Sequence, residues 1–168
     1  YKDSKFERIR ESIYSLRKTK RLLTVNVYGL RSMTHPGDLA LVLQKAVTDT
    51  LRKHKIEIAV STDYENYIAH IQQNPEIWNH LIDTHTSLSS VVSDCQQLVD
   101  GLSTGDIAIF HRVTDTLREA QLDIRLNNDN IKKWLGEVEN SLAELGTYSG
   151  LLIIWDEFTD VMTDAIGI

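Results

Sequence analysis

The sequence is poor in cysteine, since Cys95 is the only one among 168 residues. One thiol cannot form an internal disulfide or build a zinc knuckle by itself, so we expect the chain in a reducing cytoplasm. We interpret Cys95 as a small buried hydrophobe, with a reactive thiol as the alternative. Long apolar runs are also missing: the longest ends at Trp155 and falls well short of the roughly 20 residues that cross a bilayer. No basic segment precedes an apolar one at the start, so nothing indicates a membrane or secretion.

An excess of positive charge is absent as well. The net charge of −6 disfavours nonspecific attraction of the whole chain to nucleic acid phosphates, and nucleic acid is therefore an unsupported partner. A basic cluster near the start is interpreted as a solvated helix face, with phosphate contact as the alternative. It comprises Arg8, Arg10, Arg17, Lys18, Lys20 and Arg21. The 42% hydrophobic and 25% charged residues are typical of a globular protein, and the length fits one domain.

The first sixty residues predict a helix, a strand and a second helix. Apolar residues at helical spacing indicate an amphipathic helix over Ser4–Lys18, and the β-branched run Leu22–Leu30 indicates a strand. Turn residues follow, and Asp38 could cap a helix that begins at Leu39 and ends in a basic segment. Ile56–Val60 is either a short strand or an extended connector.

Residues 61–145 predict four or five successive helices, because each break carries a capping or breaking residue. The expected helix starts are Ser61 or Thr62, Pro75, Ser87, Asp106, and Asn128 or Asp129. Apolar patches around Trp78 and around Trp134 are interpreted as core packing. The alternative is that these helices form an interaction module for a partner protein.

A turn at 146–150 leads into Leu151–Trp155, an apolar run of strand length. The two strands are far apart in sequence with helices between them, which favours parallel pairing. We therefore predict an α/β fold, mostly helical, with a small parallel sheet. The expected parts are a strand-helix part at 1–60, a helical insertion at 61–146, and the last strand with its following segment at 147–168.

Two adjacent carboxylates, Asp156 and Glu157, follow this last strand directly. In open α/β folds ligands bind beyond the carboxyl ends of the strands, and an Asp there can hold hydrated Mg²⁺ beside phosphates. The neighbouring Glu can activate an attacking water. The alternative is that both acids are simply the first residues of the next helix, where negative side chains interact favourably with the positive end of the helix dipole.

The segment GLLIIWDEF, followed by Thr159, resembles the Walker B region of additional-strand P-loop ATPases, the AAA+ and signal-transducing group. The segment IIWDEFT is also similar to a segment of large ATPases from bacterial phage-defence systems of the BREX type. The resemblance implies a partial P-loop fold in which Phe6–Leu16 matches an early helix and Leu22–Leu30 the strand after it. It also implies that Asp156 holds Mg²⁺ through water, that Glu157 is the catalytic base, and that ATP and Mg²⁺ bind in the intact protein.

The chain departs from this family because it contains no GxxxxGK(S/T) loop, which supplies the phosphate cradle. Either the loop lies in a part of the same polypeptide upstream of Tyr1, or the motif is degenerate and the fold serves binding without hydrolysis. We favour the first explanation, which makes the remainder of the polypeptide the main partner. This chain alone is then not expected to hydrolyse ATP.

Other residues give weaker signals. Arg31 follows the first strand and could meet phosphate or a partner at the edge that holds Asp156, or be a solvated loop residue; His35 shares this ambiguity. His70, His80, His85, His111 and Cys95 have poor spacing for one zinc site, so none is expected there. No GxSxG elbow anchors a hydrolase triad.

Overall fold

The computed structural model describes residues 4–19, 21–28, 35, 37–122, 124 and 130–156. It is mostly helical with a small parallel sheet, which is the fold class predicted at the coarse level. The elements are α1 (Ser4–Thr19), β1 (Leu22–Val27), α2 (Asp38–Lys53), α3 (Asp63–Gln73), α4 (Pro75–Thr84), α5 (Thr86–Ser89), α6 (Cys95–Ser103), α7 (Ile107–Glu119), α8 (Ile131–Glu144) and β2 (Gly150–Trp155). Among the described residues no helix is long and apolar enough to cross a membrane.

The described chain divides into two compact units. The sheet unit comprises 1–32, 46–60 and 130–168, and the helical unit comprises 33–45 and 61–129. Helix α8 packs against the sheet and belongs to the sheet unit.

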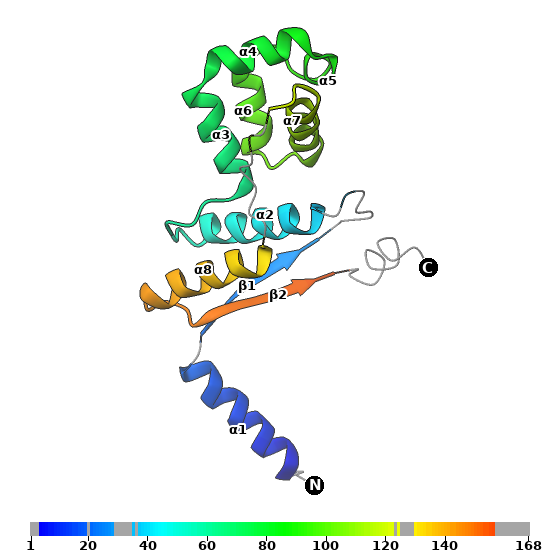
Figure 1. Cartoon of the computed structure of the whole chain (residues 1–168). Helices are drawn as coiled ribbons and strands as arrows, with labels where there is room; N and C mark the ends of the chain where they lie inside the picture. Colours follow the sequence, from blue (N-terminus) through cyan, green and yellow to red (C-terminus); the bar gives the residue numbers. More distant parts are fainter. Residues whose placement is uncertain are drawn as a thin grey trace, which may run out of the picture. The chain divides into compact units, whose positions relative to one another are not determined.

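The two strands pair in parallel, as the sequence predicts, with Leu22 opposite Gly150 and Val27 opposite Trp155. Their arrows point the same way in Figure 1. The ladder extends at both ends, because Ser149 N donates to Arg21 O at 2.7 Å and Asp156 N donates to Val27 O at 3.1 Å. The carboxyl ends of both strands therefore lie at one edge of the sheet.

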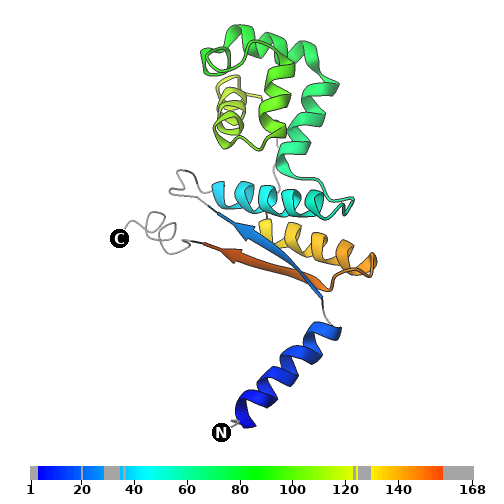
Figure 2. The same ribbon diagram turned by 180° about the vertical axis from the view of Figure 1, so that it is seen from behind.

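One face of the sheet is covered by helices. Alternate residues of β1, including Leu23 and Val25, are buried against Val47 of α2 and against Trp134 and Val138 of α8. Figure 2 shows α2 and α8 side by side along the strands, as does the opposite view. Ile56, Ile58 and Val60 pack on the same core without pairing, so the segment 56–60 is a connector rather than a strand.

The other face of the sheet is exposed and carries apolar residues beside Thr24 and Asn26. Leu22, Leu152 and Ile154 are 44%, 44% and 49% exposed. They belong to the positions that alternate with the buried ones, so they share a face. Among the described residues, no element covers these three apolar side chains well enough to bury them.

Helices α3 to α7 form the helical unit around a core of its own (Figure 2). Trp78 is fully buried there, and its Nε1 donates to Nδ1 of His70 at 3.0 Å. Trp134 is likewise buried in the sheet unit. Both tryptophan patches are thus core packing, as predicted, although Ile77 beside Trp78 is 46% exposed.

Most predicted helix starts are confirmed, those of α3 and α7 by capping hydrogen bonds. Thr62 and Glu65 form a reciprocal capping box on α3, Pro75 lies in the first turn of α4, and the Asp106 carboxylate accepts from two N–H groups of α7. Gly146 has a φ of +69°, which a glycine tolerates, and ends the turn after α8.

Three helix starts differ from the prediction. The single helix expected from Ser87 is wrong, since α5 ends at Ser89 and α6 begins at Cys95, capped by Asp94. The start of α8 is also wrong: Asn130 is the N-cap residue, because its side chain accepts from Lys133 N at 3.1 Å. Asp38 is itself the first residue of α2, one position earlier than expected.

The packing of α8 on the sheet predicts a contrast between two leucines of the same region. Leu142 is fully buried, whereas Leu145 is 53% exposed. Leu142→Ala should lower the free energy of unfolding by about 2–5 kcal/mol, since it leaves a cavity. Leu145→Ala should change it by less than about 0.5 kcal/mol. Urea unfolding followed by tryptophan fluorescence measures both, and equal losses would contradict this packing.

Candidate functional site

The predicted catalytic edge lies at the carboxyl ends of β1 and β2. Asp156 is the residue directly after β2, and its backbone N–H donates to Val27 at the end of β1. It therefore stands beside the last residues of both strands. Arg31 and Glu157, which the sequence assigns to the same edge, lie outside the described residues.

The side chain of Asp156 is exposed. It continues the alternate positions of Leu152 and Ile154 on the open face of the sheet. Within the described part of the chain, no lysine or arginine forms an ion pair with it. An exposed carboxylate at a strand end suits Mg²⁺ held through water, because Mg²⁺ prefers oxygen ligands and keeps most of its own waters.

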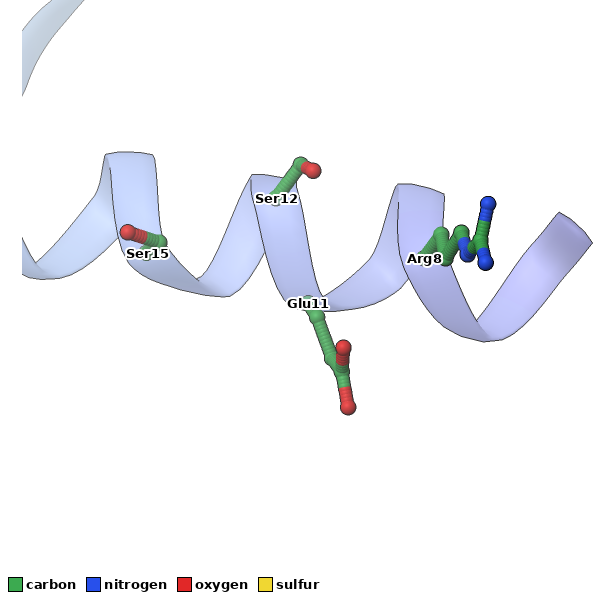
Figure 3. A pocket seen from close by; sticks show the side chains of 4 residues that line it. All are labelled: Arg8, Glu11, Ser12 and Ser15. Atoms are coloured by element: carbon green, nitrogen blue, oxygen red, sulfur yellow. The ribbon is translucent and has the colours of Figure 1, made fainter. Parts of the chain in front are cut away.

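The N-terminal helix offers no enclosed site. A surface hollow is lined by Arg8, Glu11, Ser12 and Ser15, all from α1. In Figure 3 the side chain of Glu11 points away from Ser12 and from Arg8, so these groups do not converge on one position. The hollow is the surface of one helix, and Arg8 in it is exposed, as expected of a solvated basic face.

A second polar cluster brings together residues that the sequence analysis did not group. Asp38 Oδ1 lies 2.7 Å from Nε2 of His111 on α7, and Asp38 Oδ2 accepts from the backbone N–H of His35 at 3.0 Å. The His35 and His111 rings lie 4.0 Å apart between centroids. One possible metal-ligand atom from each of the three residues lies within 4.8 Å of the others.

Negative charge gathers close to this cluster. Burial, and then the charges of Asp106, Asp38 and Asp63, raise the pKa of Tyr64 well above its usual value. Tyr64 stays neutral as a result, and its hydroxyl donates to the backbone oxygen of Gly105 at 3.3 Å. The carboxylate of Asp38 is thus one of several acids in a partly buried environment.

The remaining predicted residues do not meet in one place. His70 bonds to Trp78 in the helical core, while His80 is exposed on α4 and His85 follows that helix. Of the five residues considered for zinc, His111 alone belongs to the cluster described above. Its partners, His35 and Asp38, were assigned by the sequence to a turn and a helix cap, and 73 residues separate Asp38 from His111. Sequence spacing gave no signal for this contact.

Comparison with known proteins gives no relatives. The chain matches no protein-family model. It also matches no curated protein and no solved structure.

Cys95 lies at the start of α6 and is half-buried. Its Sγ donates to Asn79 Oδ1 at 3.0 Å, and burial, followed by the charge of Asp94, raises the pKa of the thiol. Since the thiolate is the nucleophile, a raised pKa lowers its fraction at any given pH. Alkylation by iodoacetamide at pH 8 should therefore be several-fold slower in the folded protein than in the same protein in urea. Equal rates in the two states would contradict this environment.

Proposed function

We propose that this chain forms part of the ATP-binding and ATP-hydrolysing core of a larger P-loop ATPase. In this proposal Asp156 holds Mg²⁺ through water and Glu157 activates the hydrolytic water. The observation that carries the proposal is the position of Asp156. This exposed residue directly follows β2 and lies beside the end of β1, the parallel neighbour of β2. This is the edge at which open α/β sheets bind their ligands.

The order of elements supports the proposal. A helix, a strand and a helix precede the Walker B-like strand, in the order that the resemblance implies. The two strands are direct parallel neighbours, so groups that follow β1 and β2 share an edge. A phosphoryl-transfer site needs a metal-holding acid and a water-orienting group close together, and adjacent acids after one strand meet that need.

The open face of the sheet supports the idea that other parts of the same polypeptide complete the core. Leu152 and Ile154 are about half exposed, opposite Thr24 and Asn26 of β1. A two-stranded sheet is marginal by itself, and exposed leucine and isoleucine side chains on its open face favour coverage by further elements. The phosphate-binding loop would belong to this remainder of the polypeptide, which is the main partner proposed.

The alternative function, a noncatalytic scaffold of helices, has less support. It interprets Asp156 and Glu157 as the start of a helix and the helical block as an interaction module, but both Trp78 and Trp134 are buried in cores rather than presented to a partner. The helical unit can still carry partner contacts on other surfaces. Such contacts are compatible with hydrolysis in the sheet unit.

Glu157→Gln in the intact polypeptide tests the proposal. This change removes the base but keeps the size of the side chain, so kcat for ATP hydrolysis should fall by about 100-fold or more. The Kd for ATP should stay within about threefold, because the base acts in the transition state rather than in binding. Steady-state hydrolysis and equilibrium binding of a fluorescent ATP analogue measure the two constants.

Glu119→Gln is the matched control, since Glu119 is exposed on α7 in the helical unit. It should leave kcat and Kd unchanged. Hydrolysis retained by the Glu157→Gln protein would remove Glu157 from the role of base. A polypeptide without any GxxxxGK(S/T) loop upstream of Tyr1 would remove the basis for ATP hydrolysis itself.

A further inference from the structure

The helical unit contains a cluster of metal-ligating side chains that the ATPase proposal does not use. It consists of His35, Asp38 and His111, which all belong to the same compact unit. Asp38 is the first residue of α2, His35 lies three residues before it, and His111 belongs to α7. We propose that these three residues form a binding site for a zinc ion, with Nε2 of His111, a ring nitrogen of His35 and the carboxylate of Asp38 as ligands.

The donor set fits zinc. Two imidazoles and one carboxylate are ligands that Zn²⁺ takes in open sites, at bond lengths of about 2.0–2.2 Å. Tetrahedral ligands at such bond lengths lie about 3.3 Å from one another. The separation of Asp38 Oδ1 from His111 Nε2 is 2.7 Å, and all three ligand atoms lie within 4.8 Å. Side-chain adjustments of about 1 Å would bring the set to this geometry, with the metal replacing the direct contact of Asp38 and His111.

The carboxylate is already held in place by the backbone. Asp38 Oδ2 accepts from the N–H of His35, while the N–H of Asp38 donates to the carbonyl of His35 at 3.1 Å. This pair of bonds closes the turn that carries His35 toward Asp38. Outer-shell hydrogen bonds of this kind fix the orientation of a metal ligand before the metal arrives.

The site is open on one side. The Asp38 side chain is 4% exposed and that of His111 is 19% exposed, whereas His35 is an exposed residue. The ligands therefore run from the interior to the surface, and water can reach the fourth position of the metal. Three protein ligands and a solvent-accessible position are the pattern of a reactive or exchangeable zinc site rather than a closed structural one.

The simpler reading is an ion pair between Asp38 and His111 that needs no metal. The two readings differ at His35. His35 donates to the Asp38 carboxylate through its backbone N–H, which a change of its side chain keeps, while its ring packs on the ring of His111. A zinc site loses a ligand when that ring is removed, which makes His35→Ala the decisive variant.

The experiment measures Zn²⁺ binding to the tag-free chain by competition with a chromogenic chelator, together with the absorption of the Co²⁺-substituted protein. We expect one Zn²⁺ per chain and a Co²⁺ spectrum of the tetrahedral type. His35→Ala, Asp38→Asn and His111→Ala should each weaken Zn²⁺ binding by about tenfold or more, since ligand and outer-shell losses have effects of this size.

His80→Ala is the matched control, because His80 is an exposed histidine of the same unit outside the cluster. It should bind Zn²⁺ as the unaltered chain does. Circular dichroism of each variant in EDTA shows whether it folds, and the exposed position of His35 makes its variant the one expected to fold normally. No Zn²⁺ binding by the unaltered chain, or equal binding by a folded His35→Ala variant, would overturn the proposal.

Discussion

The parallel pairing of β1 with β2 is the constraint on which the sheet unit depends. Parallel neighbours cannot be joined by a hairpin, so the chain must return from the carboxyl end of one strand to the start of the next. Helices α2 and α8 lie on that route in sequence, and both bury apolar residues on the same face of the sheet. The helical unit is inserted within the same crossover. One pairing thus explains why a chain with only two described strands is mostly helical, and why the residues after both strands share an edge.

Because the helices cover one face alone, the sheet is asymmetric. Leu23 and Val25 are almost fully buried, whereas Leu152 and Ile154, on the alternate positions, are about half exposed. Alternation along a strand sends successive side chains to opposite faces, so a strand that is apolar at every position demands cover on both. The sequence LLIIW has that composition. The exposure of Leu152 and Ile154 is a physical reason for the proposal that further elements cover this face, independently of any likeness to ATPases.

Local signals in the sequence were enough to predict most elements, and the failures have a common cause. The starts of α3, α4 and α7 carry Thr62 with Glu65, Pro75 and Asp106, whose effects depend on neighbouring N–H groups. The break before Asp94 contains no glycine or proline, so helical periodicity continues through it in the sequence. The four adjacent cap-forming residues before α8, 127–130, are equivalent in local sequence, and only the structure shows that Asn130 is the cap. The contact of His111 with Asp38 is tertiary throughout and has no local signal.

The two proposed metal sites differ in the chemistry of their donors, and this makes them separable. Asp156 offers a single exposed carboxylate, which suits a hard ion that keeps its waters, such as Mg²⁺ beside phosphates. The cluster of His35, Asp38 and His111 offers imidazole nitrogens, which Mg²⁺ binds poorly and Zn²⁺ binds well. Excess Mg²⁺ should then fail to displace zinc from the helical unit, because ligand type rather than charge selects the ion. The same argument means that loss of the imidazoles would leave the proposed Mg²⁺ site at the strand edge unchanged, so neither proposed site depends on the other for its metal.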